Sequence, residues 1–149
     1  MRKCAIILTL ILLSVTAQAQ KRLVNTDKQG LALKGHDPVA FFTQGRPVLG
    51  DYRYESNYNG TRYRFASAEN KKLFDTDPAR YVPQFGGFCA YGVSRGYAVD
   101  VELDAFQIVD GRLLMQYDKS VRDRFNQDTE GNLKRADANW PKVVEKEGR

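Results

Sequence analysis

The chain has 149 residues and carries a net charge of +5 near neutral pH, from 23 Lys and Arg against 18 Asp and Glu. Basic and acidic residues are interleaved, so the composition excludes a protein that binds nucleic acid through long basic runs. Eight Tyr, eight Phe and one Trp supply enough large apolar side chains for one core without disulfides. The length suits a single small domain.

The first nineteen residues have the layout of a secretory signal peptide. Arg2 and Lys3 precede an apolar run over residues 5–15, and Ala17-Gln18-Ala19 forms a small-x-small cleavage site. The apolar run is too short to span a bilayer. We therefore expect an exported protein, periplasmic or extracellular, whose mature chain begins at Gln20 and keeps no stable membrane span. A retained membrane anchor is the alternative.

Residues 20–34 are polar and without a clear period, which indicates an extended lead segment. Gly35-His36-Asp37-Pro38 is a turn signal. Residues 39–42 follow as a short buried element, either a strand or a single helical turn.

Two hairpins are the clearest elements of the sequence. Asn59-Gly60 lies between two aromatic-rich runs, and both turn residues tolerate the positive φ of a type I′ turn. Tyr63 and Phe65 should then share one face of the hairpin, opposite two arginines. Asp110-Gly111 predicts a second hairpin between residues 106–109 and 113–117.

Short helices are expected after each hairpin. Ser67 is the cap of the first, and Asp77-Pro78 starts another, with Asp77 as its cap. A helix over 119–127 follows the Asp118 cap. A last helix is expected over 132–144, interrupted at Trp140-Pro141.

The resulting fold class is α+β: two β-hairpins packed with several short helices in a single small domain. The expected divisions are a signal peptide at 1–19, the lead segment at 20–34, the domain at 35–144 and a polar tail at 145–149.

The pattern from Tyr58 to Tyr81 resembles the YHS domain family, which is related to small metal-binding knuckle domains. The resemblance is carried by the Asn59-Gly60 turn, the Tyr63-x-Phe65 strand and the Asp77-Pro78 pair. Segments 35–42, 86–92 and 136–141 look like a secreted branch of the same family. The resemblance thus covers residues 35 to 141.

The resemblance also implies what this chain lacks. Metal-binding relatives place cysteines where this chain has Ala66 and Asn70. A methyl group cannot bind a metal, and a neutral amide is a poor ligand for a soft one. We expect the inherited metal site to be absent and its shape to persist.

Cys89 is the only cysteine outside the expected signal peptide, and His36 is the only histidine. Cys89 is therefore a buried small residue, a metal ligand, a reactive thiol or half of an intermolecular disulfide. With His36 it could hold copper or zinc, with Asp37 or Tyr91 as a third ligand, or form a Cys–His reactive pair. A polar turn residue is the plainer interpretation of His36.

A ligand pocket is the other candidate site, and Asp37, Tyr63, Phe88 and Tyr91 are its candidate lining. Cross-strand packing is the alternative role for the hairpin tyrosines. No serine-hydrolase, zinc-protease, phosphate-loop or dinucleotide motif occurs in the chain.

The sequence therefore favours a non-catalytic module that binds an unknown small ligand or protein partner. One alternative is a metal-handling protein that uses Cys89 and His36 for copper or zinc. The other is a thiol-dependent redox protein acting through Cys89.

Overall fold

The computed structural model describes residues 20–149; the expected signal peptide at 1–19 lies outside this range. In the first half the elements are α1 (Pro38–Thr43), β1 (Asp51–Tyr58), β2 (Thr61–Phe65), α2 (Ala68–Thr76) and α3 (Pro78–Tyr81). The second half contains α4 (Ala90–Ser94), β3 (Glu102–Val109), β4 (Arg112–Gln116), α5 (Lys119–Asn126) and α6 (Thr129–Glu147). Short 3-10 turns lie at Leu33–Gly35 and Gln84–Gly87.

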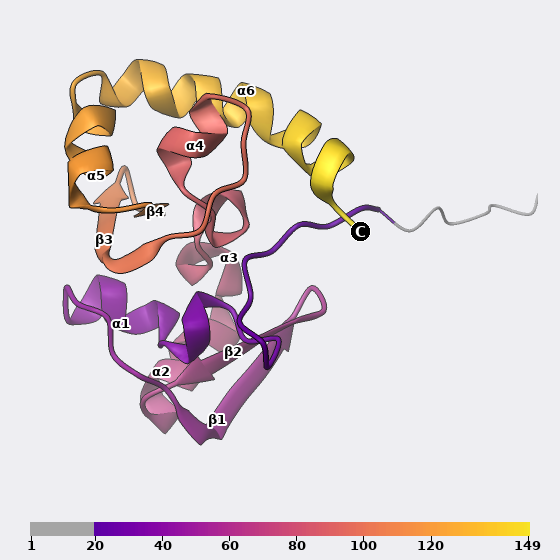
Figure 1. Cartoon of the computed structure of the whole chain (residues 1–149). Helices are drawn as coiled ribbons and strands as arrows, with labels where there is room; N and C mark the ends of the chain where they lie inside the picture. The colour runs from indigo at the N-terminus through magenta and orange to yellow at the C-terminus, as the bar shows by residue number, and fades with distance from the viewer. Residues whose placement is uncertain (1–19) are drawn as a thin grey trace, which may run out of the picture.

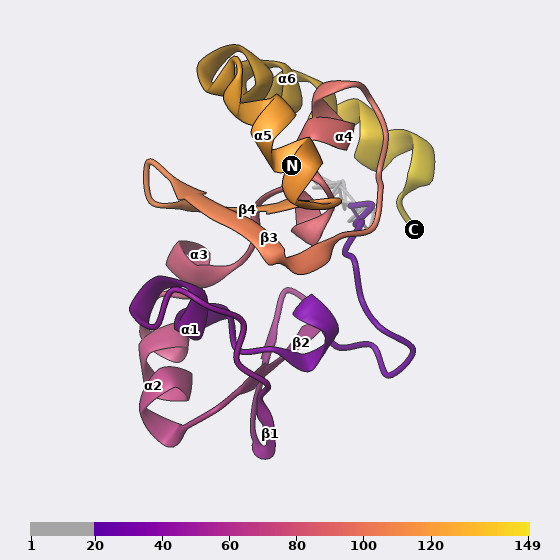
Figure 2. The same ribbon diagram turned by 60° about the vertical axis from the view of Figure 1, so that its left-hand side comes forward.

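Two halves, each built on one hairpin, lie against each other (Figure 1). β1 and β2 form an antiparallel pair beside α1 and α2, whereas β3 and β4 form a second pair covered by α4, α5 and α6. The turned view keeps α3 between the two halves (Figure 2). The α+β prediction, with two hairpins and several short helices in one small domain, is confirmed.

The first hairpin closes at the predicted turn. Asn59 and Gly60 have φ values of +51° and +77°, and Ser56 pairs with Tyr63 across the strands. Along β2, Tyr63 and Phe65 are buried, which confirms the predicted inner face. The second hairpin turns in the same way, with positive φ at Asp110 and Gly111.

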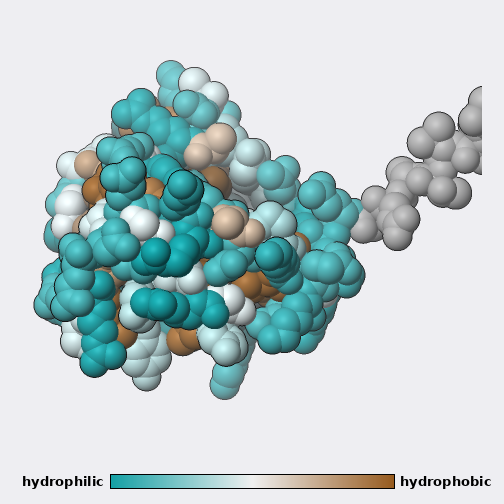
Figure 3. Space-filling model, turned by 90° about the horizontal axis from the view of Figure 1, so that it is seen from above, coloured by the Kyte–Doolittle hydropathy of each residue, from teal (hydrophilic) through white to brown (hydrophobic). Residues whose placement is uncertain are grey.

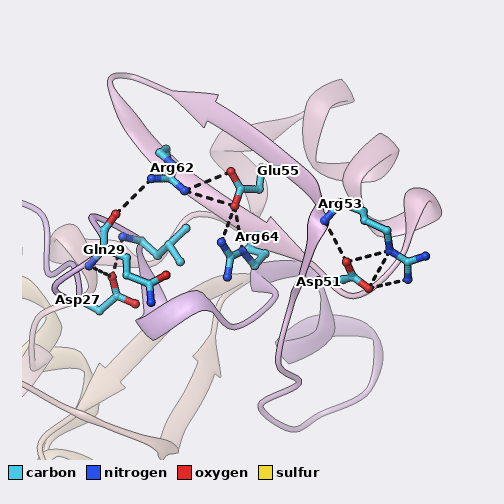
Figure 4. Close-up of polar contacts among 8 residues, drawn as sticks. Asp27, Gln29, Asp51, Arg53, Glu55, Arg62 and Arg64 are labelled. Carbon is cyan, nitrogen blue, oxygen red and sulfur yellow. Dashed lines mark hydrogen bonds and ion pairs between the residues drawn. The ribbon is translucent and has the colours of Figure 1, made fainter.

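The outer face of the first hairpin carries an ion network (Figure 4). Arg64 donates to Glu55 through Nε and Nη2, at 2.9 and 2.6 Å, and Arg62 reaches the same carboxylate at 3.3 Å. Hydrogen bonding from Arg64 lowers the pKa of Glu55. Arg53 and Asp51 pair separately on the neighbouring strand. The two arginines predicted on this face, Arg62 and Arg64, thus bind one carboxylate of their own hairpin, that of Glu55.

Most of the helices begin at a residue whose side chain accepts a hydrogen bond from a backbone N–H of the first turn. Ser67 accepts from the backbone N–H of Asn70, and Asp118 accepts from that of Val121, as predicted. Asp77 stands at the cap position of α3, but its side chain makes no cap bond. Residues 39–42 belong to helix α1, which settles the strand-or-helix alternative.

The predicted interruption at Trp140-Pro141 is wrong, because α6 runs unbroken from Thr129 to Glu147. Pro141 removes only one intrahelical N–H. The buried side chains of Ala136 and Val143 hold the helix against the rest of the molecule on both sides of that position.

Within residues 20–149, the core consists of three adjoining clusters of buried side chains. The first lies under the first hairpin and includes Phe65 and Phe74, whose ring centroids are 4.9 Å apart. The second joins α1 to β4 through Phe41 and Met115, and the third lies beneath α6 around Phe125. Seen from the α6 side, the surface is mostly hydrophilic with small scattered apolar patches (Figure 3).

The two ends of the described chain lie side by side, as Figures 1 and 2 show. Arg22 and Arg149 exchange two backbone hydrogen bonds of 3.0 Å each, and Lys21 forms an ion pair with Glu145. Residues 20–25, here called the N-terminal strap, therefore pair with the segment expected to be a polar tail. Within residues 20–149, no helix combines the length and apolarity needed to cross a membrane.

Candidate functional site

Asp37 is a buried carboxylate that accepts hydrogen bonds from four N–H groups. Its side chain is fully buried. One carboxylate oxygen, Oδ1, accepts from the backbone N–H of Val39 at 2.8 Å and caps α1. The other, Oδ2, accepts from the backbone N–H of Ala66 at 2.8 Å and from Asn70 Nδ2 at 2.7 Å. One carboxylate thus ties together α1, the end of β2 and the start of α2.

The contacts of Asp37 decide whether a metal ion fits beside Ala66 and Asn70. The family resemblance implies cysteines at these two positions in metal-binding relatives, whereas here both residues donate hydrogen bonds to Asp37 Oδ2. The Ala66 methyl offers no ligand atom, and Asn70 turns its amide N–H toward the carboxylate and keeps only a neutral amide oxygen, which is a poor ligand for a soft metal. The residues at this position do not fit a metal. A carboxylate lock, defined as Asp37 with Ala66 and Asn70, joins the same elements instead.

Cys89 lies elsewhere, at the start of α4. It is 1% exposed, and its thiol donates to Gln116 Oε1 at 3.4 Å. Its sulfur accepts from the backbone N–H groups of Gly92 and Tyr117 at 3.4 and 3.3 Å. Burial raises the pKa of the Cys89 thiol, although these backbone N–H groups partly oppose the rise. The thiol form therefore prevails at neutral pH, which disfavours nucleophilic chemistry.

Gln116 is the buried partner of Cys89. Its side chain is fully buried, and Oε1 also accepts from the backbone N–H of Tyr91 at 3.1 Å. Its Nε2 has no hydrogen-bond partner within residues 20–149. The Cys89 thiol and the Tyr91 backbone N–H both donate to Oε1, which fixes the orientation of the amide. A flipped amide would place its own N–H groups against the N–H of Tyr91.

His36 is bound to the backbone of its own turn. Its Nδ1 lies 3.2 Å from the carbonyl oxygens of both Leu33 and Lys34, so Nδ1 is the protonated donor. The side-chain hydrogen bonds of His36 and those of Cys89 go to different residues. Among residues 20–149, no group of three or more His, Cys, Asp or Glu side chains is placed to hold a metal ion. Asp37 thus does not complete a three-ligand site with them, and the Cys89–His36 pair itself stays a prediction.

The four residues expected to line one pocket occupy three different settings. Asp37 belongs to the carboxylate lock, and Tyr63 lines a groove between the N-terminal strap, the first hairpin and α6. Phe88 and Tyr91 pack against the third core cluster. Tyr91 also accepts a hydrogen bond from Arg95, whose guanidinium lies 4.9 Å from its ring centroid.

The groove lined by Tyr63 has a volume of about 520 Å³. The N-terminal strap, the turn of the first hairpin, the segment after α3 and the C-terminal half of α6 form its walls. Its aromatic and apolar lining includes Tyr58, Trp140, Pro83 and Val144. Its size is within the usual range for small-molecule sites.

Trp140 and Gly86 were not among the predicted site residues. Trp140 is half-buried, with its ring centroid 6.0 Å from that of Phe85. At Gly86, φ is +60° and any Cβ would clash with the carbonyl oxygen of Leu23 in the strap. The sequence signal for this close approach was the Gly86-Gly87 pair, but its strap partner is about sixty positions away in the chain.

Residues 39–85 match the family model of the YHS domain. The match begins in α1, contains the first hairpin with Ala66 and Asn70, and ends in the 3-10 turn at Phe85. The match at residues 39–85 agrees with the family that the sequence resemblance indicated. No curated protein and no solved structure matches the chain.

Proposed function

We propose that this protein is an exported, non-catalytic binding module whose ligand lies in the groove between the N-terminal strap, the first hairpin and α6. The observation that carries the proposal is this groove, in which Tyr63 and Trp140, far apart in sequence, line one concave surface. Concave sites with aromatic walls and a few polar groups are the usual form of small-molecule sites.

The lining suggests the chemistry of the ligand. Tyr58 and Trp140, both half-buried, offer ring surfaces, and Val144 adds aliphatic surface. Asn59 and Thr61 supply polar groups at the hairpin end. A small molecule with an apolar ring and one polar substituent suits this combination, because rings stack on aromatic faces while the polar group finds a partner.

Trp140 provides a direct readout, since it is the only tryptophan of the chain. We would titrate 4-methylphenol, benzoate and cyclohexanol while exciting Trp140. At least one should give a saturable change in emission. Val144→Phe, which fills the groove, should weaken that binding tenfold or more.

Leu73→Phe is the matched control. Leu73 lines a separate groove between α2 and α3, so the same larger side chain there should leave binding unchanged. Thermal melts would establish that both variants fold. Equal binding by wild type and Val144→Phe, or no saturable response to any of the three compounds, would contradict the proposed groove.

The YHS match at residues 39–85 suggests a metal-related role as a second candidate. The residues predicted for it, Cys89 and His36, lie outside the matched segment. Burial of Cys89 and the backbone contacts of His36 argue against it. Native mass spectrometry with added Cu(I) or Zn(II) decides the matter. We expect no stoichiometric metal; metal bound by the wild type and lost in Cys89→Ser would replace the first proposal.

A further inference from the structure

Gln20 becomes the first residue of the mature chain if the leader is removed after Ala19, as the proposed export requires. An N-terminal glutamine differs chemically from every internal one, because its α-amine can reach its own side-chain amide carbon. The five-membered ring that forms is a lactam. The surroundings of Gln20 therefore bear on whether this ring can form.

Gln20 is the first residue that the structure describes, and it is open to solvent. Its side chain is exposed at the edge of the groove. The anchors of the strap begin only at the next residue: Lys21 Nζ donates to the backbone oxygen and to Oε1 of Glu145, at 2.8 and 2.9 Å. Arg22 follows with its backbone pair to Arg149.

We propose that Gln20 of the exported chain is a modification site and is converted to pyroglutamate. The α-amine attacks the side-chain Cδ, a C–N bond forms, the Cδ–Nε2 bond breaks, and ammonia leaves with the displaced proton. No oxidant, reductant or other co-reactant is needed. The product is a neutral lactam at the rim of the groove.

The modification has a structural consequence. The strap supplies Leu23 and Val24 to the groove wall, and its Asn25 donates a backbone hydrogen bond of 2.8 Å to Gly86. A lactam has no free amine for aminopeptidases to recognise. The cyclised end therefore protects the segment that closes the groove.

The test uses the full chain, leader included, expressed in an exporting bacterial host and purified from the periplasm. Intact and tandem mass spectrometry would read the mature N-terminus. We expect most molecules to begin at residue 20 and to be lighter by one ammonia, with the loss located on Gln20. Pyroglutamyl peptidase should then remove that residue.

Gln20→Asn is the matched control, because its amide is one methylene shorter and closure would require a strained four-membered ring. It should keep its ammonia and a free amine. Ammonia lost from Asn59-Gly60 instead would appear equally in both proteins and would count against the proposal. Mature wild type with a free Gln20 amine overturns cyclisation but leaves export intact, whereas a retained leader overturns both. Neither result bears on ligand binding in the groove.

Discussion

At the scale of single residues, Asp37 joins α1, the end of β2 and the start of α2 through hydrogen bonds. Its two carboxylate oxygens accept from four N–H groups, on Val39, Ala40, Ala66 and Asn70. A buried carboxylate is tolerated only when such donors replace its hydration. The link that Asp37 makes between α1, β2 and α2 therefore depends on the geometry of these hydrogen bonds.

The lock predicts a clear loss of stability for Asn70→Ala. This change removes the 2.7 Å side-chain bond to the buried carboxylate, so the free energy of unfolding should fall by about 1.5–3 kcal/mol. Asn126→Ala, at the exposed end of α5, should stay within about 0.5 kcal/mol of the wild type. Urea unfolding measures both, and equal effects would show that the lock contributes nothing.

Tyr63 gives a prediction for alkaline pH. Burial raises its pKa from 10.0 to about 12, so the folded state favours the protonated phenol. This contribution to stability is complete below pH 10 and is lost as the pH rises toward 12. A shift of this size corresponds to roughly 2–3 kcal/mol.

Tyr63→Phe should therefore flatten the dependence of the unfolding free energy on pH between 10 and 12. Tyr52→Phe is the control, because Tyr52 is 77% exposed and should leave the slope unchanged. Urea titrations at several pH values provide the measurement. A Tyr63→Phe slope as steep as that of the wild type would mean that another group titrates there.

At the scale of elements, the contact between the strap and the 3-10 turn depends on Gly86. Gly86 and Gly111 both have positive φ, +60° and +74°, but only Gly86 faces another segment, while no atom lies within 4 Å of a Cβ at Gly111. Alanine at either site incurs a backbone cost of about 1–2 kcal/mol. At Gly86 the clash with Leu23 should add about 1–3 kcal/mol.

The difference between Gly86→Ala and Gly111→Ala in urea unfolding thus measures the close approach alone. Trp140 should report it as well, because its ring lies 3.2 Å from the position of the added Cβ, so the emission of Gly86→Ala should change. Equal destabilisation with unaltered emission would indicate that the strap does not lie against the turn in solution.

Local chemistry explains which elements could be predicted. The turns at Asn59-Gly60 and Asp110-Gly111 and the caps at Ser67 and Asp118 act within a few residues, so the sequence displays them directly. The continuity of α6 across Pro141 was missed because packing outweighs one lost hydrogen bond. The resemblance to relatives marked Ala66 and Asn70 as lacking metal ligands, yet their common partner Asp37 lies about thirty residues upstream and shows only in the fold.

At the scale of the whole molecule, the matched YHS segment shares its core with the second half. Phe41 in α1 packs on Phe106 of β3, with ring centroids 4.8 Å apart, and belongs to a cluster that contains Leu113 and Met115. Phe85, at the end of the match, belongs to the cluster beneath α6. Only the first cluster lies almost wholly within residues 39–85, with Ala32 as its one outside member.

A chain cut to residues 39–85 should consequently fail to fold cooperatively. It would expose Phe41 and Phe85 and lose the cover of β3, β4 and α6, and a segment this short has little core to spare. Circular dichroism should show no sigmoidal thermal transition for it, whereas residues 20–149 should melt in one transition. Independent cooperative melting of the short chain would show that the YHS segment is a folding unit by itself, with the second half as an accessory. The expected result instead makes the second half a structural requirement, because it supplies the apolar surface that Phe41 and Phe85 need.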